Sequence, residues 1–181
     1  DTEGRERECL ELLKNDYQIS AIRLRVWVNP RGGSCGKEEV LAMALRAKKL
    51  GMDVMIDFHY SDWWADPAKQ PIPKAWMGHS YEEMKQDLRN HTVEVLTLLK
   101  ENGVEPRWVQ VGNETANGML WNVKTDERGW EIKDEKGNTT VTYSMGHIET
   151  HPEQYAGFIG AGYDAVKEVL PNDIVIVHLY R

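Results

Sequence analysis

Four short runs of apolar, mostly β-branched residues alternate with helical patterns, and this alternation limits the fold more than any other feature of the chain. The runs span residues 22–28, 53–58, 108–111 and 174–177, with the length and composition of buried strands. Helical periodicity predicts helices over residues 6–13, 37–50, 80–102 and 152–170. Strands that alternate with helices in this way lie parallel and are joined by helical crossovers, so the sequence predicts an α/β fold.

Residues at the expected helix ends support these boundaries. Ser80 and Glu83 fit a capping box at the start of the longest helix, and Gly103 follows its end. Gly51 is the stop signal of the preceding helix, while Pro152 lies in the first turn of the last one.

Two architectures fit the alternation: a doubly wound sheet and part of an eight-stranded barrel. No phosphate-binding glycine motif, G-x-G-x-x-G or G-x-x-x-x-G-K-[ST], follows any of the strands, which weakens the nucleotide-binding form of the doubly wound sheet. Residues 124–147 interrupt the pattern with apolar residues that alternate on both sides of 134–139, and we expect an inserted hairpin there. We treat residues 1–181 as one domain that carries this insert.

Composition excludes several classes of partner. The net charge of −7 argues against nucleic acid, which needs a basic surface, and no apolar run is long enough for a membrane span. Residues 1–20 are too charged for a signal peptide, although a trimmed chain would look the same. The two cysteines leave a disulfide and free thiols equally open. Seven Trp beside two Phe favour either sugar binding or core packing.

Polar and aromatic side chains gather just after the expected strand ends, where barrel enzymes place their active sites. These residues are Arg25 in the first run, Asp57 at the end of the second, His59, Trp63 and Trp64 after the second, Asn113 and Glu114 after the third, and His178 after the last. Glycoside cleavage needs a carboxylic acid that protonates the leaving oxygen and a second carboxylate across the sugar. Glu114 fits the first role, and the alternative is that Asn113 and Glu114 only cap a helix.

Long motifs give the chain a resemblance to a known family. They are IRLRVWVNP (22–30), AKKLGMDVMIDFHYSDWWADPAKQPIPKAW (47–76), WVQVGNET (108–115) and GMLW (118–121). With these motifs the sequence resembles the arabinogalactan endo-β-1,4-galactanases of glycoside hydrolase family 53. The resemblance implies a (β/α)8 TIM barrel, of which this chain covers about strands 2 to 5. It also implies retaining endo-hydrolysis of β-1,4-galactan, the side chain of pectin.

The resemblance assigns roles to individual residues. Glu114 would be the general acid/base, and Asn113 would contact the sugar at the reacting subsite. The residues that would line or brace the site are Arg25, Asp57, His59, Trp63, Trp64 and His178. Trp121 would lie beside Glu114 and could stack on a galactose ring. For Arg25 a buried ion pair beneath the site is equally open. We expect no cofactor, no metal ion and a monomer.

One departure from the family is large. The family's nucleophilic glutamate ends its seventh strand, whereas this sequence begins after the first strand and reaches about the fifth, and no Glu after Glu114 stands at a strand end. We therefore expect the chain alone to be inactive. Because pectin side chains are too large to enter a cell, the substrate implies a secreted, periplasmic or surface location.

Three alternatives stay open. The barrel could bind galactan or another sugar without cleaving it, or it could be another retaining β-glycosidase of the same barrel clan. A metal-dependent hydrolase could instead use Asp57, His59, Asp62 and His79, although the sequence has no H-x-H pair and these residues come from one stretch.

Overall fold

The computed structural model describes residues 3–124, 132–138, 140–142 and 145–180. Its main sheet has four parallel strands, β1 (Ala21–Val26), β2 (Asp53–Phe58), β3 (Trp108–Val111) and β6 (Ile174–Ile176), in the order β1-β2-β3-β6. Spatial order thus follows chain order, as in a barrel. In a doubly wound sheet the spatial order of the strands reverses at a switch point, and the order of these four strands does not reverse.

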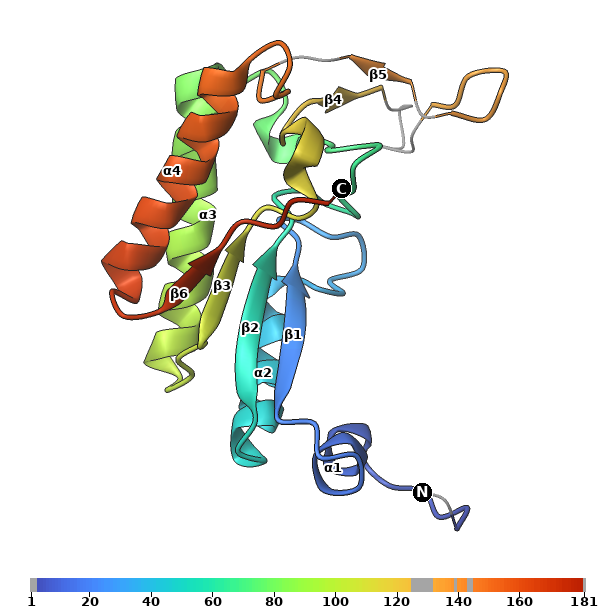
Figure 1. Cartoon of the computed structure of the whole chain (residues 1–181), viewed down its shortest axis with the longest axis vertical. Helices are drawn as coiled ribbons and strands as arrows, with labels where there is room; N and C mark the ends of the chain where they lie inside the picture. Colours follow the sequence, from blue (N-terminus) through green and yellow to red (C-terminus); the bar gives the residue numbers. More distant parts are fainter. Residues whose placement is uncertain (1–2, 125–131, 139, 143–144, 181) are drawn as a thin grey trace.

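Three helices lie along one side of this sheet: α2 (Lys37–Lys49), α3 (Tyr81–Glu101) and α4 (Pro152–Val169) (Figure 1). The short helix α1 (Cys9–Asn15) precedes β1, and two 3₁₀ turns, η1 (Lys74–Trp76) and η2 (Thr115–Asn117), lie in loops. The expected capping box is confirmed, because Ser80 accepts from the backbone N–H of Glu83 while the Glu83 carboxylate accepts from that of Ser80.

The hydrophobic core lies between the sheet and these helices. From the strands come Val26, Val54, Ile56, Phe58, Val109 and Val111, all at most 4% exposed. From the helices come residues such as Ala44 on α2, Leu88 and Leu96 on α3, and Phe158 on α4. Alternate residues of each strand therefore form an apolar surface, which we call the helix face. Its burial is the main source of stability in a fold of this kind.

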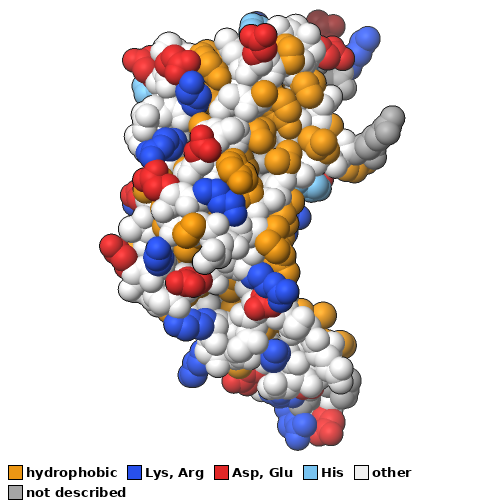
Figure 2. Space-filling model, turned by 60° about the vertical axis from the view of Figure 1, so that its left-hand side comes forward, with side chains coloured by type: hydrophobic (Ala, Val, Ile, Leu, Met, Phe, Trp, Pro, Cys, Tyr) orange, Lys and Arg blue, Asp and Glu red, His pale blue; other side chains and the backbone are white. Residues whose placement is uncertain are grey.

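The opposite surface, which we call the site face, carries a different set of side chains. Strand register places Arg23, Met55, Trp108 and Ile174 in one row and Arg25, Asp57, Gln110 and Ile176 in the next. Large apolar residues near the C-terminus are exposed, among them Ile174 (53%) and Leu179 (60%). Figure 2 shows hydrophobic side chains gathered along a hollowed border of the molecule, while charged residues cover much of the rest of the visible face.

The first strand is shorter than the sequence predicts. It ends at Val26 because the next two backbone N–H groups bond to loops instead of a neighbouring strand: Trp27 donates to the carbonyl of Cys35 and Val28 to that of Ser61. Both Cys9 and Cys35 are free thiols, so the structure chooses between the two options that the sequence left open.

β5 (Val141–Thr142), within the expected insert, pairs in antiparallel fashion with β4 (Asn122–Val123), which lies just before its expected start. The Asp134 side chain accepts from the backbone N–H groups of Lys136 and Asn138 and so closes a turn. Residues 125–131, 139 and 143–144 of the predicted insert lie outside the described residues. Among the helices that the structure describes, none combines the length and the apolar character needed to cross a membrane.

Candidate active site

A pocket of about 300 Å³ opens where the strands β1, β2 and β3 end. Seven of the nine side chains that the sequence predicts for the site line it: Arg25, Asp57, His59, Trp64, Asn113, Glu114 and His178. Arg23, Ala65 and Asp66 complete the lining. Tertiary structure thus gathers residues that are up to 155 positions apart in the sequence, between Arg23 and His178, at the edge where barrel enzymes hold their catalytic groups.

Glu114 is placed by an unusual stretch of backbone. Gly112 has φ +81°, and Glu114 itself adopts the left-handed conformation with φ 51° and ψ 50°, which is uncommon for a residue with a Cβ. Glu114 stands at the N-cap position of η2, yet its side chain makes no capping hydrogen bond. Within the part of the chain that the structure describes, no hydrogen bond or ion pair engages its carboxylate. A half-buried acid without a partner is thus left in the pocket.

Asn113 is buried at 6% exposure and held from several directions. Its Oδ1 accepts from a guanidinium nitrogen of Arg23 at 2.8 Å, and Nδ1 of His178 lies 3.1 Å from it. Its amide nitrogen donates to the carbonyl of Ala65 at 2.8 Å. An amide nitrogen has two N–H groups, so one remains for a ligand.

Asp57 lies beneath the pocket, where it is 3% exposed. Arg23 forms an ion pair with it at 2.9 Å, and the amide nitrogen of Gln110 donates to it at 2.5 Å. His59 approaches through Nε2 at 3.3 Å, while its Nδ1 accepts from the backbone N–H of Ala65. Because Nδ1 accepts, the proton of a neutral His59 is on Nε2, which can then donate to Asp57.

An aromatic cluster flanks the pocket. The guanidinium carbon of Arg25 lies 3.9 Å from the ring centre of Trp64 and 4.8 Å from that of Trp27. Trp27 is also tilted against Trp63, with ring centres 4.7 Å apart. Trp63 and Trp64 are 50% and 43% exposed. Exposed indole faces beside a polar pocket can pack against the C–H groups of a sugar ring.

Two of the nine predicted residues do not line the pocket, namely Trp63 and Trp121. Trp121 is not brought to the pocket: it is 1% exposed and packs edge-on to His147, with ring centres 6.0 Å apart. A side chain that is covered in this way has no free face for a galactose ring. Among the residues that the structure describes, Arg25 makes no ion pair with a carboxylate, and its guanidinium reaches the thiol of Cys35 at 3.2 Å and the indoles. Arg23 forms the ion pair instead.

Three residues of the site escaped sequence reasoning. Arg23 and Gln110 bond to both Asp57 and Asn113. Both are polar residues at alternate positions of apolar strands, and that alternation marks a second sheet face. Gln70, at 2% exposure, donates to the carbonyls of Asn113 and Glu114. Nothing in the local sequence identifies Gln70, because its partners lie more than 40 residues away.

The residues of the metal hypothesis do not converge. Asp62 accepts from the backbone N–H groups of Asn29 and Lys74, and His79 bonds to Asp87 at 2.6 Å. Over residues 3–124 and the shorter described stretches after them, no group of three or more His, Cys, Asp or Glu side chains has a metal-binding arrangement.

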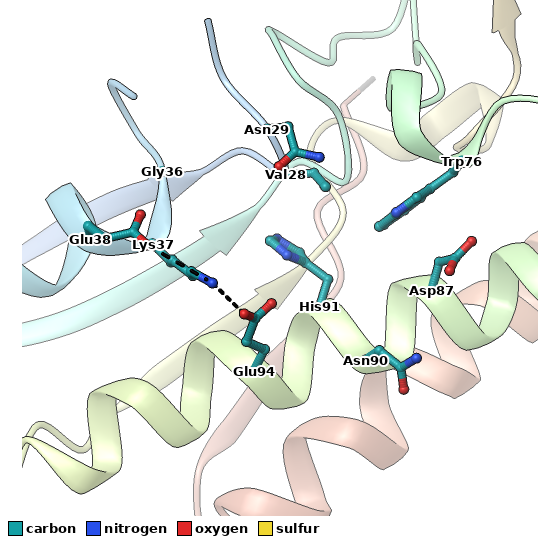
Figure 3. Close-up of a pocket in the computed structure, with 10 residues that line it drawn as sticks. All are labelled: Val28, Asn29, Gly36, Lys37, Glu38, Trp76, Asp87, Asn90, His91 and Glu94. Atoms are coloured by element: carbon teal, nitrogen blue, oxygen red, sulfur yellow. Dashed lines mark hydrogen bonds and ion pairs between the residues drawn. The ribbon is translucent and has the colours of Figure 1, made fainter. Parts of the chain in front are cut away.

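A second hollow, of about 440 Å³, lies between α2, α3 and the loop after β1 (Figure 3). Its charged groups are already paired, Lys37 with Glu94 and Asp87 with His79. Its histidine and tryptophan, His91 and Trp76, are only 7% and 6% exposed. We interpret this hollow as a seam between helices. Burial lowers the pKa of His91 to about 4, so this imidazole is neutral at neutral pH.

Comparison with known proteins gives the family. The model of the family described as "Glycosyl hydrolase family 53" matches residues 1–181. An "Uncharacterized protein in bgaB 5'region" of Niallia circulans is 41% identical over 181 residues, which are all of this chain and 45% of that protein. The "Arabinogalactan endo-beta-1,4-galactanase" of Thermothelomyces thermophilus is 38% identical over 127 residues, which are 64% of this chain and 38% of that enzyme. The chain thus spans less than half the length of these relatives.

Solved structures agree. The "Ignisphaera aggregans GH53 catalytic domain" superposes with a TM-score of 0.81 at 37% identity, over 98% of this chain and 45% of that one. A structure from a study of "two fungal beta-1,4-galactanases" gives a TM-score of 0.77 at 30% identity, over 95% and 45% of the two chains. The four parallel strands and their helices are thus part of a (β/α)8 barrel, and the chain belongs to glycosyl hydrolase family 53.

Proposed function

We propose that this chain is part of an enzyme that hydrolyses β-1,4-galactan internally, with Glu114 as the general acid/base of a retaining mechanism. The observation that carries the proposal is the carboxylate of Glu114, which lines the pocket and has no protein partner in the described part of the chain. The names of relatives as endo-β-1,4-galactanases support the choice of substrate.

In this mechanism Glu114 protonates the glycosidic oxygen as the bond to the anomeric carbon breaks, and later deprotonates the water that releases the product. The free N–H of the Asn113 amide is placed to donate to a sugar hydroxyl next to the reacting carbon. Because Arg23 and the carbonyl of Ala65 fix the Asn113 side chain, little side-chain freedom is lost when the sugar binds. Trp63 and Trp64 offer exposed rings for flanking galactose units.

Retention requires a second carboxylate as nucleophile, about 5–5.5 Å from the first. The other two carboxylates of the pocket are engaged: Asp57 by Arg23 and Gln110, and Asp66 by the backbone N–H groups of Ala68 and Lys69. We therefore propose that the nucleophile comes from sequence outside these 181 residues. On this proposal the 181-residue chain by itself does not cleave galactan.

The proposal is tested with the complete protein and β-1,4-galactan, by measuring the release of reducing ends. Replacing Glu114→Gln keeps the shape and removes the transferable proton, so we expect kcat to fall by at least about 10²-fold. The matched control is Glu149→Gln, which changes an exposed glutamate outside the pocket and should keep full activity. An unchanged rate in Glu114→Gln would exclude the role assigned to Glu114. Retention is tested separately: NMR identifies which anomer of the product forms first, and a retaining enzyme gives the β-anomer.

A non-catalytic galactan-binding barrel is the second candidate, and the engagement of Asp57 and Asp66 favours it. Calorimetric binding of galacto-oligosaccharides without any released product would select it. A panel of polymers with other β-linkages separates galactanase activity from another retaining β-glycosidase of the same clan.

A substrate of this size also bears on location. Galactan is too large to enter a cell intact, so we propose that the protein acts in a secreted, periplasmic or surface-bound form. Cell fractionation with an antibody against the chain tests this, and a purely cytosolic signal would contradict it.

A further inference from the structure

Side-chain amides form hydrogen bonds between two loops at the pocket. The loop after β2 supplies residues 65–70, and the loop after β3 supplies residues 112–117. Asn113 donates to the carbonyl of Ala65 and Asn117 to that of Pro67, both at 2.8 Å. In the opposite direction, Gln70 donates to the carbonyls of Asn113 at 2.9 Å and Glu114 at 3.3 Å. Three amides thus join two loops that are remote in the sequence.

Gln70 differs from the other two amides in what it holds. Its nitrogen reaches both peptide carbonyls that flank the Cα of Glu114, the residue whose left-handed backbone turns its side chain into the pocket. The carbonyl of Asp66, 3.2 Å away within its own loop, is a third acceptor that shares the two N–H groups of this nitrogen. At 2% exposure, Gln70 makes these bonds away from water, where no solvent molecule readily replaces a lost donor.

The loop that carries Gln70 is closed by its own hydrogen bonds. Asp66 and Lys69 exchange two backbone hydrogen bonds, of 2.8 and 3.0 Å. The carboxylate of Asp66 also accepts from the N–H groups of Ala68 and Lys69. Gln70 is therefore a donor fixed on a closed turn, and the loop after β3 is held against it.

We propose that Gln70 is a positioning residue for the reaction: it holds the Asn113–Glu114 backbone in the one conformation that aims the acid of Glu114 at the glycosidic oxygen. The inference rests on the proposed role of Glu114. A non-glycine residue in the left-handed region persists only where its surroundings hold it. Gln70 is the buried donor in contact with the carbonyls on both sides of that residue. If the Glu114 carboxyl group is misoriented, the chemical step becomes slower, while most contacts to the substrate stay in place.

The first variant for the test is Gln70→Met, which keeps the length of the side chain and removes the donor. In the complete protein we expect kcat on β-1,4-galactan to fall on the order of 10- to 10²-fold, with KM changed by less than about threefold. The matched control is Gln86→Met, at an exposed position of α3 where the glutamine amide contacts Asn90, and it should keep wild-type kcat. Wild-type kcat in Gln70→Met would overturn the inference.

The second variant, Gln70→Glu, gives a readout that general loosening of the loop would not produce. An ionised carboxylate cannot donate to the two carbonyls and repels them, whereas a protonated carboxyl donates again. The ratio of the variant's kcat to that of the wild type should therefore rise towards acid pH. A ratio that is flat with pH would count against a donor role.

A third measurement separates this inference from the proposed function. The backbone N–H of Thr115 donates to the carbonyl of His178 at 2.9 Å, so its hydrogen exchange reports on the backbone just after Glu114. Exchange should be faster in Gln70→Met than in Gln86→Met, whether or not the protein cleaves galactan. Faster exchange in a protein without galactanase activity would refute the proposed function but support the positioning role of Gln70. Unchanged exchange would refute that role. If Gln70→Met fails to fold, Asn117→Ala takes its place, because Asn117 is exposed and its amide donates to the carbonyl of Pro67 in the other loop. This variant should show smaller changes in kcat and in the hydrogen exchange of Thr115.

Discussion

The two faces of the four-stranded sheet are made by the same strands, yet they follow different chemistry. The helix face is apolar and dry, with Ile56, Phe58 and Val109 fully buried beneath α2, α3 and α4. On the site face, Asp57 and Gln110 are just as buried but hydrogen-bonded, to each other and to Arg23. The difference teaches that burial serves stability on one face and the orientation of polar groups on the other.

The largest effect is expected from a substitution that creates a cavity on the helix face. Leu88 is fully buried on α3, and Leu88→Ala should lower the free energy of unfolding by about 2–5 kcal/mol. The rate per folded molecule should stay at the wild-type value, because no contact to the pocket is lost. Chemical denaturation together with an assay on galactan measures both. A large loss of specific activity would show that the two faces are not separable.

Acid should weaken the helix layer through His91. Its pKa is lowered from about 6.5 to about 4 because the imidazole is buried, while Glu94 and Lys37 nearby act in opposite directions. The unfolded chain thus binds a proton at higher pH than the folded chain does. The stabilising contribution of neutral His91 is complete above pH 6.5 and is lost as the pH falls through about 4. The total loss in the free energy of unfolding is about 3 kcal/mol.

Unfolding free energies at pH 7 and pH 4 check this expectation. His91→Gln should lose about 3 kcal/mol less than the wild type over this range. Equal losses in both proteins would mean that His91 is not held neutral by the core.

The site face is tested by two Arg–Asp pairs at opposite ends of β2. Asp57 pairs with Arg23 and Asp53 with Arg107, both at 2.9 Å, but the side chain of Asp53 is 47% exposed and that of Asp57 only 4%. Asp57→Asn should lower kcat on the order of 10-fold, because Arg23 loses the charge that holds it beside Asn113. The cost in stability should be about 1 kcal/mol, since Arg23 is still partly solvated.

Asp53→Asn is the matched control, and it should leave kcat unchanged and stability within about 0.5 kcal/mol, as expected for an exposed ion pair. If both variants behaved alike, the pair at the pocket would have no special role.

The smallest expected effect concerns the start of α3, in the helix layer but far from the sheet. Ser80→Ala removes the side-chain half of the capping box and should cost about 1 kcal/mol of stability without a change in kcat. Thermal unfolding monitored by circular dichroism measures it, with Ser34→Ala, in the exposed loop before α2, as the comparison. A cost equal to that of the control would show that the box contributes nothing.

Much of the fold could be predicted from local pattern. The three long helices and four parallel strands follow from the spacing of apolar residues, and the capping box of α3 from Ser80 and Glu83. Strand ends were harder, because Trp27 and Val28 bond to loops. The pocket could be located from polar residues after the strands, but the partners within it could not. Arg23 and Arg25 look alike in the sequence. The strand register places Arg25 beside Asp57, yet Arg23 forms the ion pair with Asp57, while Arg25 reaches Cys35 in the loop after β1.

The sequence by itself determined the alternation of strands and helices, the two faces of each strand and the cluster of polar residues near one edge. Each of these depends on residues a few positions apart, whose spacing matches the helix or strand period. Tertiary structure alone decided that Gln70 reaches the Glu114 backbone, that Arg23 pairs with Asp57 and that Trp121 is covered. These contacts join residues that are distant along the chain, and hydrogen bonds form only where the whole fold brings donor and acceptor within about 3 Å.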